Sequence, residues 1–440
     1  MTIRSLGTSP RGVPFALGTL AVAALAAWSG AARAQNLPPP LQPGPESSSP
    51  YYLRVSETLT YDSNVFRVPE SLGERRDGIS STALTAGLDQ HLGRQRLLGI
   101  ATVRGNVFKN NDQLNNTGYD LGAQLNWEAA SRWAGDARVN FSQTLARFED
   151  YGSQTQVTSG KNQEKVALAA LRAQYGLFSL WSIEGTYNHF DINYSADTFA
   201  NRERTSDQAG LGVKFRPSGL WTFGLNWRET RGEYPQYREV GGVTEKDEYD
   251  RTDIDLTARY FATGLSTLSA RLSHTSEEHS IDSTRDFSGV TGEIRWDYQA
   301  TGKLGISTTL ARETGSGSSS SSFGDTTSYL TDSRLTNRLT VNARWNATAK
   351  IQVRAGAILA RDKFDDQFTS ITVNGQVVSA SGQTADSRTY SLSALYAATR
   401  SINFECGARY QKRDPIITSG STFLGYTANT AYCAGALTLQ

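Results

Sequence analysis

From Tyr51 to the end of the chain, apolar and polar residues alternate with a period of two. Within the segment 220–229, every second residue from 221 to 227 is large and apolar, and the residues that follow them, at 222 to 228, are polar or glycine. The apolar positions are Trp221, Phe223, Leu225 and Trp227. The segments 251–260 and 350–359 repeat the pattern, with Ile358 as an exception. This is the period of a β-strand, and a tilted strand of about ten residues is long enough to cross a bilayer.

A single strand with this pattern could also belong to a soluble β-sandwich. The lengths of the connections between the strands distinguish the two folds. Tight turns are expected near Gly93, Ala130, Gly176, Ser218, Thr263, Thr301, Ala347 and Thr399. Longer polar loops are expected at 62–78, 149–163, 234–248, 316–332 and 364–385. Short and long connections alternate, and the eight tight turns join sixteen strands, to which 51–62 and 425–440 add two. The sequence therefore predicts an all-β fold, a single antiparallel outer-membrane β-barrel of about 18 strands with short periplasmic turns and long extracellular loops.

Proline and tryptophan support this arrangement. After Pro50 the chain has Pro69, Pro217, Pro235 and Pro415, and we expect each in a turn or loop, because a ladder facing lipid cannot lose an N–H donor. Most tryptophans of residues 51–440 lie within a few residues of a predicted tight turn. They predict an aromatic girdle at the periplasmic interface, with sandwich-core aromatics as the alternative. The girdle candidates are Trp127, Trp133, Trp181, Trp221, Trp296 and Trp345.

The first 50 residues differ from the rest. Arg4 and Arg11 precede an apolar, alanine-rich stretch over 13–28, and Ala32-Arg33-Ala34 is a cleavage signal, so residues 1–34 are expected to be a signal peptide. An uncleaved membrane anchor is the alternative. Residues 35–50 are rich in proline and serine, which predicts an extended periplasmic linker before the barrel at 51–440.

Composition narrows the function classes. Hydrophobic residues make up 38% of the chain and the mean hydropathy is −0.44, yet aromatic residues reach 10%. The net charge is +1, and removing three arginines with residues 1–34 leaves 41 basic and 43 acidic residues, a charge of −2. This balance gives no basic surface for nucleic acid.

Patterns for catalysis or metal binding are sparse. The sequence has no H-E-x-x-H, G-x-S-x-G or Walker A motif, and Gly210-Leu211-Gly212 lacks the third glycine of a dinucleotide site. His274 and His279 flank Glu277 and Glu278, which imitates a metal site, but a solvated charged rim is expected there. We therefore expect no catalytic residues, no metal and no cofactor.

Cys406 and Cys433 lie at equal distances from the centre of the last predicted loop. Antiparallel pairing would place them opposite each other, and the periplasm is oxidising, so a cross-strand disulfide is expected. Two small lipid-facing thiols are the alternative.

The polar face of the predicted strands mixes arginines, acids, amides and hydroxyls. Such a surface suits a hydrated pore for a bulky polar or weakly charged solute, although the arginines could simply pair with acids on neighbouring strands. An 18-stranded wall leaves room for an aqueous channel unless a loop folds inward, for which 316–322 and 364–385 are candidates. The lumen candidates are Arg104, Asp120, Arg138, Arg172, Arg228, Asp253, Asp255, Arg259, Arg295, Arg354 and Glu405.

Residues 53–70, LRVSETLTYDSNVFRVPE, resemble the opening strand of the β-barrel porins encoded with exopolysaccharide clusters, the EpsL family associated with exosortase B. The match to that family's recurrent element consists of Tyr61, Asp62, Asn64, Phe66 and Arg67. The resemblance implies a passive outer-membrane conduit for secreted polysaccharide, with outer-membrane lipid and periplasmic or inner-membrane export components as partners. Asp62 and Asn64 are themselves turn-forming residues at a strand end, and a sugar contact is a hypothesis for them.

Three alternatives remain open from the sequence. The first is a general or sugar-selective diffusion porin. The second is an outer-membrane enzyme acting on lipid or polysaccharide, for which a converged Ser–His or carboxylate pair would be needed. The third is a structural or adhesive barrel with a plugged lumen.

Overall fold

The computed structural model divides the chain into Met1–Ala34 and Gln35–Gln440. Only the second unit contains described residues, so the signal-peptide and linker predictions lie largely outside them. The structure describes residues 49–70, 73–130, 132–146, 161–176, 179–240, 242–281, 283–314, 334–364, 371–373, 376–378, 384–414, 416–418, 421–423 and 425–440.

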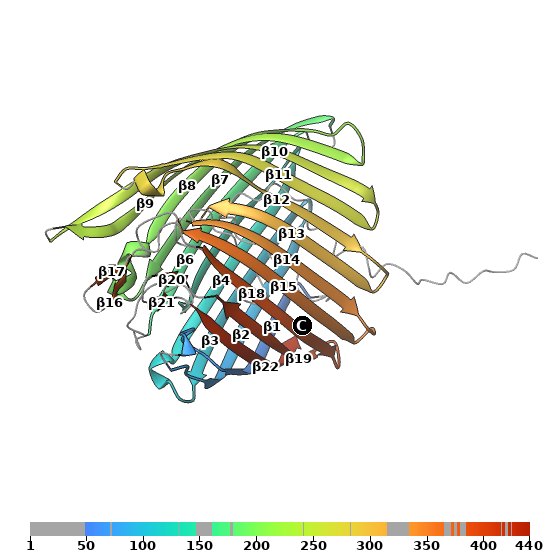
Figure 1. The fold of residues 1–440 in the computed structure, drawn as a ribbon. Coiled ribbons are helices and arrows are strands. Elements are labelled where there is room, and N and C mark those ends of the chain that lie inside the picture. Colours follow the sequence, from blue (N-terminus) through green and yellow to red (C-terminus); the bar gives the residue numbers. More distant parts are fainter. Residues whose placement is uncertain are drawn as a thin grey trace, which may run out of the picture. The chain divides into compact units, whose positions relative to one another are not determined.

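Eighteen antiparallel strands form one sheet (Figure 1). The first strand, β1, pairs with β2 on one side and with the last strand, β22, on the other, with Leu53 opposite both Ala86 and Leu439. The sheet is therefore closed, and the predicted 18-stranded barrel is confirmed. Its strands are β1 (Tyr51–Asp62), β2 (Asp77–Leu92), β3 (Gln95–Phe108), β4 (Asn116–Ala129), β5 (Trp133–Leu145), β6 (Gln163–Tyr175), β7 (Trp181–Tyr194), β8 (Arg204–Phe215), β9 (Trp221–Val240), β10 (Val243–Thr263), β11 (Ser266–His279), β12 (Phe287–Gln299), β13 (Leu304–Thr314), β14 (Arg334–Asn346), β15 (Ile351–Phe364), β18 (Thr384–Ala397), β19 (Ile402–Arg413) and β22 (Tyr426–Leu439).

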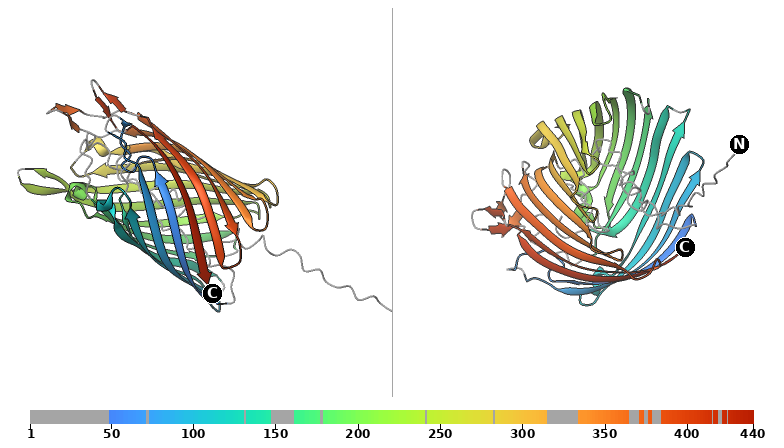
Figure 2. Two further views of the ribbon diagram at one scale, coloured as in Figure 1. Left: turned by 90° about the horizontal axis from the view of Figure 1, so that it is seen from below. Right: turned by 90° about the vertical axis from the view of Figure 1, so that its right-hand side faces the viewer.

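The two ends of the barrel carry different connections. Each predicted tight turn joins consecutive strands at one end, which we call the short-turn rim; the turn at Gly93 between β2 and β3 is an example. Gly93 and Gly176 have φ of +65° and +89°, a conformation that glycine adopts without strain. The longer connections lie at the other end, the long-loop rim. Figure 2 shows the tilted strands and the curved wall that they form.

The long-loop rim contains short elements of its own. The ribbons β16 (Ile371–Val373) with β17 (Gln376–Val378), and β20 (Ile416–Thr418) with β21 (Ser421–Phe423), lie in the last two long connections. Among the described residues of this rim are also the short 3-10 helices η2 (Asp112–Leu114), η4 (Asp197–Arg202) and η5 (Ser283–Arg285). Most of the predicted loops at 149–163 and 316–332, including the candidate plug at 316–322, and much of 364–385 lie outside the described residues.

The prediction of a loop at 234–248 is wrong. β9 and β10 continue as a paired ladder to Val240 and Val243. Pro235, expected in a loop, lies inside β9 at a register irregularity, where Tyr234 pairs with Asp247 and Arg238 with Glu245. An irregularity of this kind tolerates a residue without an N–H donor.

No helix among the described residues is both long and apolar enough to cross a membrane.

The outer and inner sides of the wall differ in chemistry. Paired residues of neighbouring strands point to the same side, so one exposed series fixes the orientation of the whole sheet. The outward series is large and apolar near the short-turn rim: Leu225, Leu256 and Leu392, for example, are 55–58% exposed. The inward series consists mainly of charged, amide and hydroxyl side chains. A single closed sheet with this polarity suits a bilayer outside and water inside.

The predicted girdle tryptophans all point outward at or close to the short-turn rim. Five of them, Trp133, Trp181, Trp221, Trp296 and Trp345, are 37–57% exposed. Trp221 stacks on Tyr260 with a centroid distance of 4.2 Å, and the rings of Trp133 and Tyr175 are tilted with their centroids 5.0 Å apart. Rings in this position place an apolar face against lipid and keep the indole N–H near water.

Glu57 is an exception on the outer wall. It lies between Val55 and Leu59, which are 44% and 61% exposed to the outside. Its carboxylate accepts hydrogen bonds from the hydroxyls of Ser80 and Thr82 on β2. These donors partly replace the hydrogen bonds to water that a carboxylate loses on the lipid-facing side of the wall.

Candidate functional site: the inner wall of the barrel

The lumen candidates from the sequence all lie on inward positions. Alternation against the exposed apolar series, carried across the sheet by the strand registers, places each of them there. They differ in burial and in their partners; nine of them fall into three groups, and two lie near the short-turn rim. These candidates are Arg104, Asp120, Arg138, Arg172, Arg228, Asp253, Asp255, Arg259, Arg295, Arg354 and Glu405.

The first group is a buried network on β9, β10 and β11. Arg228 donates to both carboxylate oxygens of Asp255, at 2.7 and 2.9 Å. Arg251 donates in the same two-bond manner to Asp253, at 2.9 and 3.1 Å. Both carboxylates are fully buried and receive further hydroxyl hydrogen bonds of 2.6 Å, from Ser273 to Asp255 and from Thr275 to Asp253. Paired forks of this geometry hold buried charges that would otherwise be costly.

Several members of this network are not among the residues predicted from the sequence. Arg251 also contacts Glu277 at 3.3 Å, and Arg271 lies 3.8 Å from Glu313 on β13. The sequence does show that these residues face the same side of the wall, because Arg251 and Asp253 are two positions apart on one strand and Arg271 and Glu277 are six positions apart on the next. Only the register shows that these side chains meet.

A second, more linear group crosses β5 to β8. Asp136 accepts from Arg138 and Arg172, each at 2.7 Å. Arg172 lies 3.6 Å from Glu184, which pairs with Lys214 at 2.7 Å. Asp136, Glu184 and Lys214 were not among the sequence candidates. The charges alternate along this ladder, so it presents little net charge to the lumen.

The third group is more open. Arg354 on β15 is exposed and lies directly opposite Arg344 on β14, while its nearest acid, Glu405, is 3.9 Å away. Arg104 is half-buried, and Asp120 is exposed and accepts a hydrogen bond from Asn140 at 3.1 Å.

Two further candidates lie near the short-turn rim. Arg295 pairs with Asp297 at 2.8 Å, and the guanidinium of Arg259 lies 4.5 Å from the centroid of Phe261. Both arginines are half-buried.

Opposite the charged networks, the inner wall at the closure of the barrel also carries small hydroxyl side chains. Ser56, Thr58 and Thr60 on β1 point inward, as do Ser391 and Ser393 on β18. This strip of hydroxyls can hydrogen-bond a neutral polar solute without binding it tightly.

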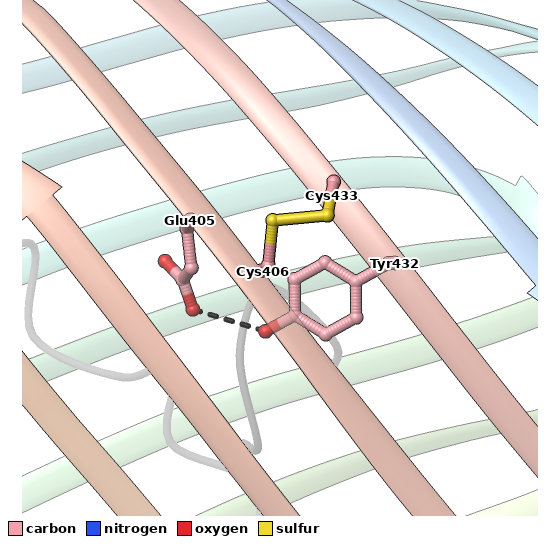
Figure 3. Close-up of a disulfide and its surroundings, with 4 residues drawn as sticks. All are labelled: Glu405, Cys406, Tyr432 and Cys433. Carbon is pink, nitrogen blue, oxygen red and sulfur yellow. Dashed lines mark hydrogen bonds between the residues drawn. A yellow bond between two sulfur atoms is a disulfide. The ribbon is translucent and has the colours of Figure 1, made fainter.

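The two cysteines lie at this closure, on the outward side. Cys406 on β19 is opposite Cys433 on β22, and the two are joined by a disulfide (Figure 3). On the neighbouring inward positions, the Tyr432 hydroxyl donates to Glu405 at 3.0 Å. Gly407 makes room for the Tyr432 ring, because a Cβ there would be 2.8 Å from the ring.

The segment that carries the family resemblance forms a compact turn where β1 ends. Arg67, with φ of +52°, donates to both carboxylate oxygens of Asp62, each at 2.8 Å. Asn64 is fully buried, and its amide donates to the carbonyls of Val68 at 2.7 Å and Thr427 at 3.1 Å. Asp62 and Phe66 are buried too, whereas Tyr61 points outward and is 49% exposed. The contacts of Asp62 and Asn64 are thus internal, and the sugar contact stays a hypothesis.

The four residues that imitate a metal site do not form one group: Glu277 and His279 meet on the inner side of β11, whereas His274 and Glu278 lie on its outer side. His274 points outward and His279 inward, because they differ in parity on β11. The expectation of a solvated rim is wrong for Glu277 and His279, which are buried. His279 accepts or donates at both ring nitrogens, 2.7 Å from Asp247 and 3.2 Å from Glu277. Within the described part of the chain, no group of three or more His, Cys, Asp or Glu residues is arranged to hold a metal.

No family model matches the chain, and no curated protein does. Solved structures resemble it in fold at low sequence identity. The OpdK structure with vanillate from Pseudomonas aeruginosa is 10% identical, covers 88% of this chain and 99% of its own, and gives a TM-score of 0.43. The OccK2 (OpdF) complex with glucuronate from the same organism is 9% identical over 89% and 98%, with a TM-score of 0.44. A ferric enterobactin receptor mutant (PfeA) from that organism is 8% identical over 90% and 81%, with 0.45.

Proposed function

We propose that the protein is an outer-membrane channel that lets small hydrophilic solutes diffuse through its lumen, without catalysis. The observation that carries the proposal is the opposite polarity of the two sides of one closed sheet. An apolar outer wall requires lipid around it, and a charged, hydroxyl-rich inner wall requires water within it. Barrels of 16 to 18 strands leave room for an aqueous channel. The short-turn rim would then face the periplasm.

The open part of the inner wall supports a preference for small anionic solutes. Arg344 and Arg354 are both exposed and lie directly opposite each other. Like charges opposed on a sheet repel, and an anion passing between them relieves the repulsion. Glu405, 3.9 Å from Arg354, limits how strongly an anion is held there. Weak binding of this kind speeds entry without blocking exit.

Planar-bilayer recording tests both parts of the proposal. We expect the purified protein to give discrete conductance steps, and a salt gradient to give a reversal potential of the sign for anion preference. Arg344→Gln with Arg354→Gln should lower the anion-to-cation permeability ratio by about two- to fivefold. Arg231→Gln, an outward cation on β9 that is 77% exposed, is the matched control and should leave the ratio unchanged. A folded protein that inserts and gives no conductance would overturn the channel, and an unchanged ratio in the double variant would overturn this origin of selectivity.

Polysaccharide export, with its secreted polymer and its periplasmic or inner-membrane partners, is the narrower function that the resemblance of residues 53–70 implied. The internal contacts of Asp62, Asn64 and Arg67 give that motif a role in folding, so it lends export little support. A liposome-swelling series separates the two functions. Uptake that stops at mono- and disaccharides supports the diffusion channel, whereas uptake of long oligosaccharides supports a conduit.

A further inference from the structure

The outer wall is hollowed beside the seam where the barrel closes. An open groove of about 800 Å³ runs over β1, β15, β18, β19 and β22, with the Cys406–Cys433 disulfide in its floor. Leu59 and Leu392 border it. A second, smaller hollow shares Tyr61, Leu392, Ala408 and Ala431 with it and continues toward Tyr390 and Tyr410 at the long-loop end.

The groove follows directly from side-chain size. On the outward positions of three neighbouring strands, the register brings together Ala394, Cys406 and Cys433 in one row and Ala408 and Ala431 in the next. The larger residues that border these rows, Leu59 and Leu392, are 61% and 58% exposed. A strip of small side chains between large ones leaves this groove along the outer wall.

Cations lie directly beyond the long-loop end of this groove. Tyr390 and Tyr410 stack with ring centroids 6.4 Å apart, and two residues further along the same strands are Arg388 and Lys412. Arg388 and Lys412 are directly opposite each other on the outer face, although like charges in that position repel. They share one acid, Asp414, at 2.7 and 3.6 Å.

One strand further, Arg361 on β15 is 64% exposed at its side chain and pairs with Asp386 at 2.7 Å. Arg361, Arg388 and Lys412 are thus three outward cations that face two acids. The excess of positive charge stands directly above an apolar groove.

This charge is local. The outward positions at the same end of β7 to β10 carry an excess of acids instead: Arg231 and Lys246 lie there among Asp191, Asp207, Glu229, Glu233 and Asp250. A general requirement of the interface would place similar charges all around the barrel. The basic face above the groove therefore indicates a specific anionic neighbour.

We propose that the groove holds a membrane lipid with a phosphorylated headgroup. One acyl chain lies over Ala408, Ala431 and the disulfide, and the phosphate lies between Arg388 and Lys412, with Arg361 beside it. A phosphate accepts charge-assisted hydrogen bonds from both cations and cancels their repulsion, which Asp414 alone only partly does. The lipid bridges β18, β19 and β22 next to the seam. The proposal rests on the membrane insertion put forward above, but not on the lumen conducting.

Native mass spectrometry of the detergent-solubilised full chain, titrated with bisphosphorylated lipid A and with the same lipid lacking phosphate, tests the proposal. We expect wild-type protein to bind the phosphorylated lipid at least tenfold more tightly than the phosphate-free one. Arg388→Gln with Lys412→Gln should remove that preference. Arg231→Gln with Lys246→Gln removes the same charge from the outer face of β9 and β10, where the side chains are 77% and 57% exposed, and should not alter binding.

Filling the groove tests the acyl chain independently. Ala431→Phe places a ring on the groove floor at a position that faces lipid, so the barrel should still fold and still shift on an unboiled gel. We expect it to weaken lipid A binding several-fold. Equal binding of both lipids by wild type, wild-type affinity in the Arg388/Lys412 variant, or complete displacement by millimolar inorganic phosphate would each overturn the proposal. A protein that fails to conduct yet binds lipid as expected would contradict the channel alone.

Discussion

Asp62 and Arg67 show how single residues hold the first long connection of the barrel in place. Arg67 binds Asp62 with two parallel hydrogen bonds, and Asp62 also accepts the backbone N–H of Asn64 at 2.9 Å. Asn64 links this turn to β22 through the carbonyl of Thr427. The segment therefore closes the long-loop end of the seam, on the opposite end from the chain terminus.

Removing the Arg67 side chain should loosen this turn. In Arg67→Ala, the Asp62 carboxylate, only 10% exposed, loses its charged partner, and we expect the free energy of unfolding to fall by about 1–3 kcal/mol. Arg67→Lys should recover little, because a lysine ammonium cannot make the two parallel bonds. The measurement is the temperature at which the unboiled gel band of the folded barrel is lost. Arg76→Ala, exposed in the same connection, is the control and should behave as wild type.

At this scale the sequence reveals which side of the wall a residue faces but not its surroundings. Parity along the strand suffices to place Asp253 and Asp255 inside. It does not show that both carboxylates are fully buried, because burial depends on the arginines that the register brings across from β9 and along β10. The buried network is therefore the part of the candidate site that sequence reasoning could not supply.

At the scale of elements, the hairpin of β9 and β10, with 20 and 21 residues, extends far beyond the apolar part of the wall, and the end of β11 pairs with its base at Tyr249. Glu248 and Glu233 face outward there, which places this part in water. On the inner side His279 is buried against Asp247 and Glu277, and Arg285 of η5 binds Asp247 at 2.9 Å. Burial works to lower the pKa of His279, but the hydrogen bonds to Asp247 and Glu277 more than offset this, and its pKa lies above the ordinary 6.5.

The raised pKa of His279 predicts that the stability of the β9–β10 hairpin beyond the apolar part of the wall depends on pH. A histidine whose pKa is raised on folding stabilises the folded state fully below about pH 6.5, and the stabilisation is lost as pH rises through the folded pKa. The carboxyl of Asp247 is also buried, yet its hydrogen bond to His279 keeps its pKa below the ordinary value, so its contribution is lost only in acid. We expect amide hydrogen exchange in β9 and β10 near Asp247 to speed up between pH 6.5 and 8.5, beyond the intrinsic increase.

A matched variant isolates the histidine. His279→Gln keeps a hydrogen-bonding side chain but does not titrate, so the ratio of exchange rates between wild type and variant should change with pH. A ratio that stays constant from pH 5.5 to 8.5 would contradict the role given to His279. The other charged or titratable groups packed around this imidazole are Tyr234 of β9, Asp247 and Tyr249 of β10, Glu277 of β11, and Arg285 and Asp286 at η5. None of them has an ordinary pKa between 6.5 and 8.5.

The same hairpin explains why the sequence predicted a loop at 234–248. Where the outward face is no longer in lipid, it carries charge, as at Glu233 and Asp250, and the apolar half of the alternation disappears. The signal that identifies a strand within the bilayer is therefore missing, although the ladder continues. The number of strands and the positions of the tight turns could be predicted from the sequence. Every strand has a lipid-facing part that begins at a tight turn, and the alternation is strongest there.

At the scale of the whole molecule, the barrel depends on pairing its last strand with its first. β22 meets β1 over Leu53–Asp62, and no covalent connection within the barrel joins these two strands at the short-turn rim. The disulfide links β22 to β19, its neighbour on the other side. It therefore fixes the register of β22 against β19 and leaves the opposite edge of β22 to pair with β1. This pairing was foreseeable because the two cysteines lie at equal distances from the centre of the last loop. Their place in the floor of a groove was not, because it depends on side chains from three other strands.

The disulfide should therefore stabilise the closed barrel. It links residues 27 apart, and closing a chain segment of that length in the unfolded state corresponds to about 3–4 kcal/mol in a chain-entropy model. We expect Cys406→Ala with Cys433→Ala to lower the free energy of unfolding by about this amount in a urea titration in detergent, with each single variant equal to the pair. Under reducing conditions wild type should fall to the level of the variants, while the variants themselves should not change. Because both cysteines point outward, the conductance of the folded double variant should match that of wild type, which separates closure of the wall from the chemistry of the lumen.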